Sequence, residues 1–209
     1  MRILAIDTAT EFGSLALVEN GVVLEEVLLH SADGFAHVLF PQIQRLLGRH
    51  GWHAADVHGF AAGAGPGSFT GVRVGLAAVK GLAEAAGAKA AAVSNLKAVA
   101  SFGSAALRAP FLDARRGEIY GALFDAELAV VEAEVVAPLP VWIASLPREG
   151  VEYLTPDPAP FAAVLQARAV PRALAGAIGR LAAPLLRDPA ALDANYVRRA
   201  DAELMWKDR

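Results

Sequence analysis

The side chains best suited to chemistry in this sequence are a carboxylate beside a hydroxyl and two further hydroxyls in a glycine-rich segment. Asp7 and Thr8 directly follow an apolar run near the start of the chain, and Ser68 and Thr70 stand among the six glycines of residues 63–83. A carboxylate can orient a metal ion, while hydroxyls and the N–H groups of a helix start bind phosphate. The candidate contacts for a nucleotide or another phosphate are therefore Asp7, Thr8, Ser68 and Thr70.

The glycine-rich segment contains GAGPGSFTGVRVG, which fits none of three familiar motifs. A P-loop needs a lysine after Gly71, where this chain has Val72. The dinucleotide-binding pattern needs a third glycine where Thr70 stands, and a nucleophile elbow needs glycines two positions before and after Ser68, where there are none. The segment instead predicts a helix over residues 71–86, capped by Ser68 or Thr70.

Gly67, Gly71 and Gly75 recur every four residues and so lie on one side of the predicted helix start. Because they lack a Cβ, this side admits close approach of another backbone or of a ligand. Two interpretations follow. Either the segment caps its helix and packs against a neighbour, or it holds an anion at the positive end of the helix.

Composition excludes several kinds of chemistry. The 209 residues include no cysteine, which excludes disulfides, thiolate nucleophiles and cysteine-ligated metal sites. None of the five histidines has another histidine four residues away, so no metal site is predicted. The formal net charge of −3 argues against binding of RNA or DNA through its phosphates by this chain alone.

No stretch of the sequence is typical of a membrane span or a secretion signal. A span needs about 18 or more consecutive apolar residues, and no such run occurs. The first apolar run also reaches Asp7 too early for a signal peptide. We therefore expect a cytoplasmic protein without membrane contact.

The two halves of the chain repeat the same order of elements. In the first half, an apolar strand ends at Asp7 and is followed by a second strand, the hairpin turn Asn20-Gly21 and a third strand. In the second half, an apolar run ends at Asp113 and is followed by a strand over residues 119–124 and a third strand. Helical patterns come after each group of strands.

This repeat predicts an α/β protein built from two related lobes, residues 1–105 and 106–209. Each lobe is expected to be a mixed sheet with helices packed on it. The order of elements, with an early aspartate after the first strand, resembles the actin-like ATPases (the ASKHA, ribonuclease H-like superfamily). A likeness of fold alone does not assign an activity.

Four motifs together resemble the TsaB (YeaZ-like) family of tRNA threonylcarbamoyladenosine biosynthesis proteins. They are ILAIDTAT at residues 3–10, GPGSFTGVRVG at 65–75 with KGLA at 80–83, DARRGEIY at 113–120 and YVRRADAE at 196–203. These motifs spread over nearly the whole chain. The resemblance implies the two-lobed fold of the TsaD/Kae-type actin-like ATPase superfamily.

The resemblance implies that the chain is a non-catalytic subunit in the formation of threonylcarbamoyladenosine (t6A) in tRNA. In this family the partner is a TsaD-type transferase, which holds a metal and transfers threonylcarbamoyl from its adenylate to N6 of adenosine 37 in tRNA. A small TsaE-type ATPase joins the assembly, and tRNA is reached only through the complex. The resemblance implies no cofactor for this chain itself, with ATP or ADP and magnesium as an alternative at a shared interface.

The resemblance also implies that the helices over residues 37–49 and 71–86 form the partner surface. They would pair with the same helices of the transferase, or with those of a second copy in a homodimer when the transferase is absent. The candidate contacts, with the arginine as polar anchor, are Phe40, Ile43, Leu47, Val72, Arg73, Leu76 and Val79. The alternative is that most of these side chains face the chain's own sheet.

A second hypothesis belongs to the enzyme class. It makes the chain a nucleotide-binding ATPase or phosphotransferase of the actin-like superfamily. Asp7 would orient a metal, and Thr8, Ser68 and Thr70 would lie near phosphates.

The turn of the motif DARRGEIY bears on this hypothesis. Two arginines and a glutamate stand where catalytic relatives have a glycine-rich turn, and they crowd the approach of a phosphate. Arg115 and Glu118 either lock the turn through an ion pair or belong to a surface that recognises a partner.

Overall fold

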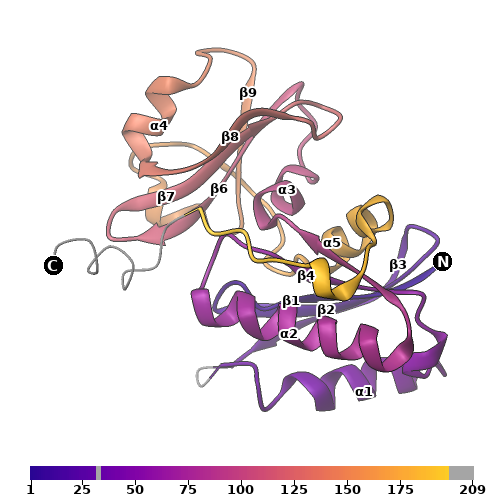
Figure 1. Ribbon diagram of the computed structural model, residues 1–209. Coiled ribbons are helices and arrows are strands. Elements are labelled where there is room, and N and C mark those ends of the chain that lie inside the picture. Colours follow the sequence, from indigo (N-terminus) through magenta and orange to yellow (C-terminus); the bar gives the residue numbers. More distant parts are fainter. Residues whose placement is uncertain (32–33, 198–209) are drawn as a thin grey trace, which may run out of the picture.

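The chain folds into two five-stranded sheets, each with helices packed on it (Figure 1). The structure is a computed structural model and describes residues 1–31 and 34–197. The motif at residues 196–203 therefore lies mostly outside the described residues. None of the described helices is both long enough and apolar enough to cross a bilayer.

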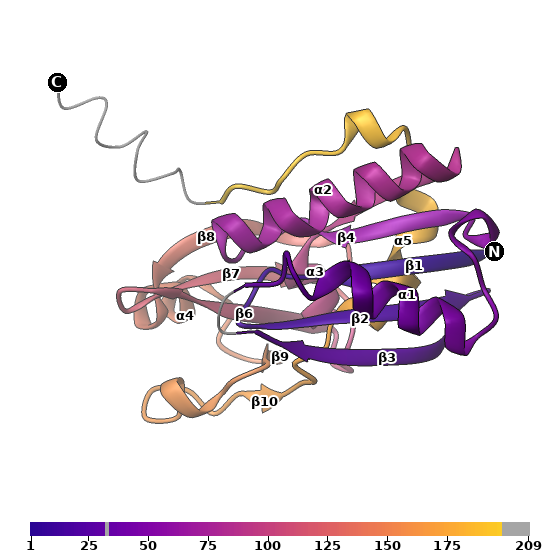
Figure 2. The same ribbon diagram turned by 90° about the horizontal axis from the view of Figure 1, so that it is seen from below.

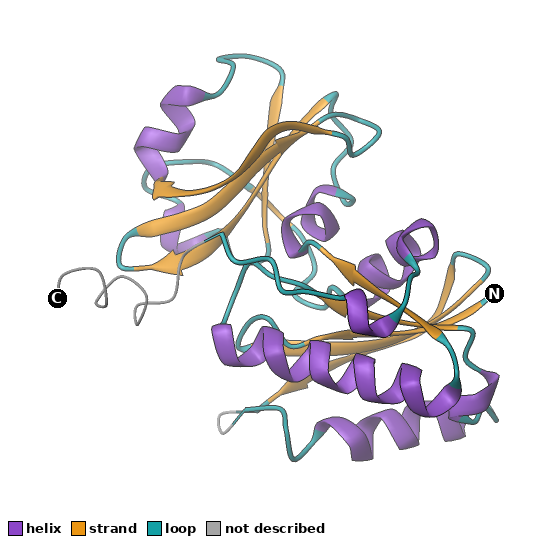
Figure 3. Ribbon diagram, in the orientation of Figure 1, coloured by secondary structure: helices purple, strands orange, loops and turns teal. Residues whose placement is uncertain are grey.

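The first sheet, whose strands are drawn in orange in the lower part of Figure 3, has the strand order β3-β2-β1-β4-β5. Its strands are β1 (Arg2–Asp7), β2 (Phe12–Glu19), β3 (Val22–His30), β4 (Gly59–Gly63) and β5 (Lys89–Val93). The first three pair antiparallel, whereas β4 pairs parallel with both β1 and β5. Asn20 and Gly21 close the β2–β3 hairpin with φ angles of 52° and 81°, which confirms the predicted turn.

Helices α1 (Leu39–Arg49) and α2 (Phe69–Ala86) lie on one face of the first sheet, and α5 (Ala175–Ala182) lies on the other (Figures 1 and 2). α2 begins slightly before the predicted Gly71. Its cap is Ser68, whose Oγ accepts a hydrogen bond from the Gly71 N–H at 3.2 Å. Thr70, the other predicted cap, lies inside the helix.

Side chains of the first sheet cap the N-terminus of α5. The Ser14 hydroxyl oxygen accepts hydrogen bonds from the N–H groups of Leu174 and Ala175 at 3.0 and 2.9 Å. The Glu26 carboxylate accepts one from the Gly176 N–H at 2.7 Å. These bonds satisfy N–H groups that a helix start cannot pair internally. α5 thus packs on the first sheet although it falls in the second predicted lobe, and the division at residue 105 stays a prediction.

The second sheet has the strand order β10-β9-β6-β7-β8. Its strands are β6 (Leu107–Arg115), β7 (Glu118–Phe124), β8 (Val130–Pro138), β9 (Val151–Thr155) and β10 (Arg168–Ala169), and helix α4 (Leu139–Ser145) packs on it. Short 3-10 helices occur at Ala54–Asp56, Ala159–Phe161, Ala183–Leu185 and Pro189–Ala191. As in the first sheet, three antiparallel strands are followed by a parallel one. The predicted α/β fold of two related lobes is confirmed.

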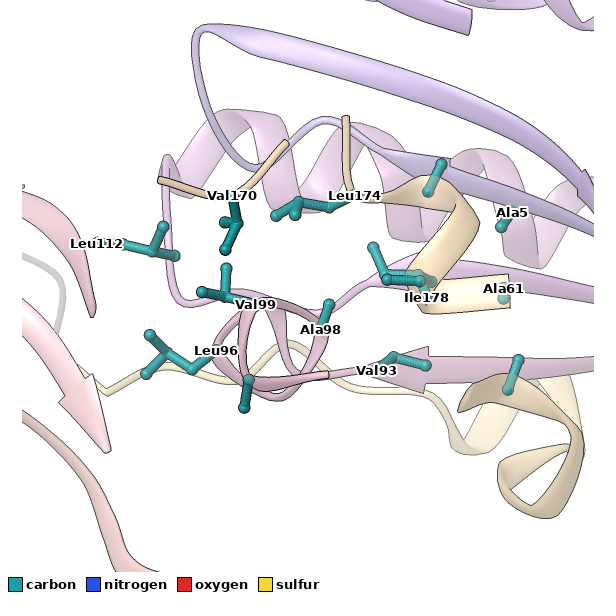
Figure 4. Close-up of a cluster of buried hydrophobic side chains, with 14 of the residues drawn as sticks. Ala5, Ala61, Val93, Leu96, Ala98, Val99, Leu112, Val170, Leu174 and Ile178 are labelled. Carbon is teal, nitrogen blue, oxygen red and sulfur yellow. The ribbon is translucent and has the colours of Figure 1, made fainter. Parts of the chain in front are cut away.

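One apolar core joins the two sheets. Helix α3 (Asn95–Ala100) lies between them and contributes Val99, while Leu112 comes from the second sheet and Ile178 from α5. Figure 4 shows Val99, Val170 and Leu174 gathered in this core. The sheets therefore do not form independent cores on their facing sides.

The segment after α5 crosses back over the first sheet, and we call residues 186–196 the C-terminal strap. Leu192 of the strap is buried in the core beneath α2. The Asn195 N–H donates a hydrogen bond to the Ala64 carbonyl at 2.8 Å, and the Asn195 side-chain amide donates one to Glu134 of β8 at 2.5 Å. Asn195 is thus hydrogen-bonded both to the loop after β4 of the first sheet and to β8 of the second sheet.

Candidate functional site

Asp7 ends β1 in the interior of the molecule, where it is fully buried. Its Oδ1 accepts hydrogen bonds from the Asn95 side-chain amide at 2.9 Å and from the Ala9 N–H at 3.1 Å. Its Oδ2 has no hydrogen-bond partner within the described part of the chain. Burial raises the pKa of Asp7 above its ordinary value of 3.8, against the lowering effect of the two hydrogen bonds. These surroundings favour a neutral carboxyl group.

The glycine-rich loop packs against the residues that follow β1. A Cβ on Gly71 would lie 2.0 Å from the Thr8 carbonyl oxygen, and one on Gly67 would lie 2.3 Å from the Ala9 carbonyl oxygen. The Ser68 N–H donates to the Ala9 carbonyl at 2.6 Å, and the Thr8 hydroxyl donates to the Gly71 carbonyl at 2.7 Å. The close approach predicted from the glycine spacing is confirmed, and the neighbour is the chain itself.

The four candidate phosphate contacts do not share one accessible surface, although the two segments that carry them pack together. Asp7 and Thr8 are buried, whereas Ser68 and Thr70 are exposed. A magnesium ion and nucleotide held by Asp7 would need that carboxylate to be accessible. Its burial and the loop packed on Thr8 both oppose this. The residues around Asp7 do not fit such a group.

A cleft of about 270 Å³ lies between the two sheets, with Ser68 at its edge. On its wall, the guanidinium carbon of Arg172 lies 4.5 Å from the centre of the Phe12 ring, and a nitrogen of Arg172 lies 3.6 Å from an Asp157 oxygen. The charged residues that line the cleft are of both signs: Glu11, Asp113, Arg115, Asp157 and Arg172. The cleft thus combines charged groups of both signs with apolar side chains, and Asp7 is not part of its lining.

The turn between β6 and β7 forms one side of this cleft and carries the motif DARRGE. Arg115 and Arg116 have left-handed backbone, with φ angles of 66° and 57°, which is uncommon for residues with a side chain. Asp113 holds the turn: its Oδ1 accepts the Arg115 N–H at 2.7 Å, and its Oδ2 lies 3.4 Å from the Arg115 guanidinium. Arg115 therefore pairs with Asp113, and recognition of a partner by this turn stays a prediction.

Helices α1 and α2 direct most of their apolar side chains toward the sheet. Five of the seven side chains predicted for a partner surface are buried in the core beneath these helices: Ile43, Leu47, Val72, Leu76 and Val79. The expectation that these five are available to a partner is wrong, because their surfaces are already covered by the chain's own core. Phe40, which is 53% exposed, and Arg73 remain on the surface. The partner surface itself stays a prediction.

Arg73 lies against the Phe69 ring and beside the Tyr196 ring on the exposed side of α2. Its guanidinium carbon is 3.4 Å from the centre of the Phe69 ring, and its Nε donates a hydrogen bond to the Tyr196 hydroxyl at 2.8 Å. The two rings are 5.5 Å apart. Tyr196 is the end of the C-terminal strap and the start of the motif YVRRADAE. We call Phe69, Arg73 and Tyr196 the Arg73 cluster.

Comparison with known proteins places this chain in a family. The family model of TsaD, tRNA N6-adenosine threonylcarbamoyltransferase, matches residues 23–137. The chain belongs to the TsaD family. The matched residues run from β3 to β8 and include both helices of the predicted partner surface.

Within the TsaD family, the chain is a TsaB/YeaZ-type protein. It is 41% identical over 127 residues to the tRNA threonylcarbamoyladenosine biosynthesis protein TsaB of Escherichia coli, and 32% identical over 137 residues to TsaB of Bacillus subtilis. These matches cover 58% and 65% of this chain, and only 54% and 60% of the two relatives. YeaZ from Pseudomonas aeruginosa matches with a TM-score of 0.79 and 26% identity, over 93% of this chain and 99% of that one. The predicted actin-like fold is confirmed.

The sequence of this TsaB/YeaZ-type chain does not reveal which residues far apart along the chain form hydrogen bonds with each other. Asn95 lies 88 positions from Asp7, and Tyr196 lies 123 positions from Arg73. One available signal is that Asn95 closely follows the apolar run of β5, as Asp7 ends β1. The carboxyl ends of neighbouring parallel strands meet at one edge of a sheet, so polar residues there come together.

Proposed function

We propose that this TsaB/YeaZ-type chain is a non-catalytic subunit that binds a TsaD-type transferase and supports threonylcarbamoylation of tRNA adenosine 37. The names of its TsaB relatives support a place in this biosynthesis. The closure of the loop over the end of β1 supports the non-catalytic role. With Gly67 and Gly71 packed on Ala9 and Thr8, the Asp7 carboxyl is kept away from any substrate.

The outer side of α1 and α2 is the proposed partner surface. Phe40, Phe69, Arg73 and Tyr196 are exposed there, and aromatic residues and arginine are the types most enriched at interface centres. In the absence of the transferase, the same surface would pair two copies of the chain. A TsaE-type ATPase belongs to the proposed assembly, and tRNA meets this subunit only through the complex. The proposed setting is the cytoplasm, with no cofactor bound by this chain alone.

Reconstitution tests this proposal. A purified TsaD-type transferase is incubated with threonylcarbamoyl-adenylate, a TsaE-type ATPase and tRNA, with and without this chain, and modified adenosine is measured by mass spectrometry. We expect modification when the chain is present, little when it is omitted, and none from the chain alone. Full modification without the chain contradicts the supporting role, and modification by the chain alone contradicts the non-catalytic role.

The cleft between the sheets favours a second candidate function, that of a nucleotide-binding ATPase or phosphotransferase. Arg115, Arg172 and Ser68 line the cleft and are residue types that bind phosphate groups. Calorimetry with ATP and ADP, with and without magnesium, tests this candidate. Heat of binding that is lost in Arg172→Ala supports it, and the absence of any heat contradicts it.

A further inference from the structure

The Arg73 cluster exposes the outer edge of a guanidinium on the surface of α2. The Tyr196 hydroxyl accepts a hydrogen bond from the Nε–H of Arg73, and the Phe69 ring covers one flat face of the guanidinium. The two terminal nitrogens make no hydrogen bond or ion pair with residues 1–31 or 34–197. Because the Tyr196 hydroxyl accepts from Arg73, its own proton is still available for donation. The site thus offers only donors, which suits an anion.

The guanidinium is held in position before any ligand arrives. Stacking on Phe69 fixes its plane, and the bond to Tyr196 fixes its rotation within that plane. A side chain that is already ordered loses less conformational entropy on binding. Phe69 and Tyr196 are themselves 43% and 46% exposed, so both rings retain surface for a partner.

The start of α2 strengthens the preference for a negative charge. The first turn of this helix contains no acidic residue, so no carboxylate of the helix offsets the partial positive charge there. Phe69 is the first residue of the helix and Arg73 stands one turn further on. An anion bound at the outer edge of Arg73 would be attracted by both the guanidinium and the helix end.

We infer that the Arg73 cluster binds the carboxylate of an aspartate or glutamate side chain of the partner protein. This inference rests on the proposed function, because it states how the transferase is recognised. A planar carboxylate takes two parallel hydrogen bonds from a guanidinium edge, and the two rings cover apolar atoms around it. An RNA phosphate would use the same donors, but the net charge of −3 disfavours a polyanion, whereas it does not prevent a single carboxylate from binding.

Four variants test this inference by calorimetry with a purified TsaD-type transferase. Arg73→Gln removes the cation, Arg73→Lys keeps the charge without the planar fork, and Tyr196→Phe removes the hydroxyl that orients Arg73. Arg180→Gln is the matched control, since Arg180 is an exposed arginine of α5 on the opposite face of the first sheet. Thermal unfolding by circular dichroism verifies that each variant is folded.

We expect Arg73→Gln to weaken binding about 10- to 100-fold, as for an interface arginine that meets a carboxylate. Arg73→Lys is expected to lose nearly as much because an ammonium group cannot make the paired bonds. The expected loss for Tyr196→Phe is smaller, about 3- to 10-fold, because only the orienting bond is removed. Arg180→Gln should bind as the wild type does.

The possible results separate this inference from the proposed function. If the wild-type chain binds the transferase and Arg73→Gln binds equally well, the inference is overturned and the proposed function stands. If the wild-type chain does not bind the transferase, both are overturned. If Arg73→Gln leaves transferase binding unchanged but weakens binding of tRNA to the complex, the ligand is a phosphate and the carboxylate inference is overturned.

Discussion

The carbonyl oxygen of Thr8 lies 2.0 Å from the position that a Cβ on Gly71 would occupy. α2 therefore rests on the end of β1 only because residue 71 has no side chain. Hydrogen bonds from Ser68 to Ala9 and from Thr8 to Gly71 hold the two segments at this distance. Of the two interpretations of the glycine-rich segment, capping and packing accounts for these glycines.

Gly71→Ala is expected to lower the free energy of unfolding by about 1–3 kcal/mol, because the new methyl group must displace backbone atoms. Gly81→Ala is a matched control in the same helix, since a Cβ there meets nothing within 4 Å. This control should raise stability by up to about 1 kcal/mol through helix propensity. Urea unfolding measures both, and equal stabilities of the two variants would contradict the close contact.

Asp7→Asn is expected to change how stability depends on pH. Because the folded chain raises the pKa of Asp7 above 3.8, the folded state holds this proton more tightly than the unfolded state. The contribution of Asp7 to stability is therefore present in full below its unfolded pKa and is lost as the pH rises through the folded value. Asparagine has no such titration, so the variant should gain stability relative to wild type with rising pH.

Urea unfolding at several pH values between about 4 and 8 measures this difference. Parallel stability profiles for the two proteins would show that Asp7 does not hold its proton in the folded chain. In the reconstituted modification reaction, Asp7→Asn should support the transferase as the wild type does. Loss of that support in a stably folded variant would point to a chemical role for the carboxyl group.

Ser14→Ala is expected to destabilise the chain by about 1–3 kcal/mol, because it leaves two buried N–H groups at the start of α5 without an acceptor. Ser145→Ala serves as the control, since the Ser145 hydroxyl donates to the Trp142 carbonyl at an exposed position near the end of α4. Its effect should stay within about 0.5 kcal/mol. Equal small effects in denaturant unfolding would mean that α5 does not depend on its cap from β2.

Phe40→Ala and Ile43→Ala separate partner binding from folding on the same helix. Phe40 is exposed, so its replacement should change stability by less than about 0.5 kcal/mol and weaken transferase binding about tenfold. Ile43 is buried, so its replacement should lower stability by about 2–5 kcal/mol. Charged substitutions at Val72 or Leu76 would likewise unfold the core. Unchanged affinity of Phe40→Ala would remove α1 from the proposed surface.

The fold follows from local signals in the sequence. Apolar runs that end at Asp7 and Asp113 mark the first strand of each sheet, and Asn20-Gly21 marks a hairpin whose backbone few other pairs adopt without strain. Ser68 gives the start of α2 because a cap must supply an oxygen to free N–H groups. Such signals depend on neighbours along the chain, so sequence reasoning can find them.

The candidate site depends on contacts that neighbours along the chain do not determine. An apolar stripe such as Val72, Leu76 and Val79 has the same spacing whether it covers its own sheet or a partner. The position of the sheet determines which of the two surfaces the stripe contacts, and here the sheet buries these three residues. Similarly, nothing near Arg73 in the sequence indicates that Tyr196 will orient it, because the strap makes that contact.

The position of Asn195 has a mechanical consequence. Through Ala64 and Glu134 it fastens the loop after β4 to the edge strand of the second sheet, and Tyr196 follows it directly. A rotation of one lobe against the other would have to lengthen or break these two hydrogen bonds. The strap therefore ties the two sheets to each other directly beside the residue that orients Arg73.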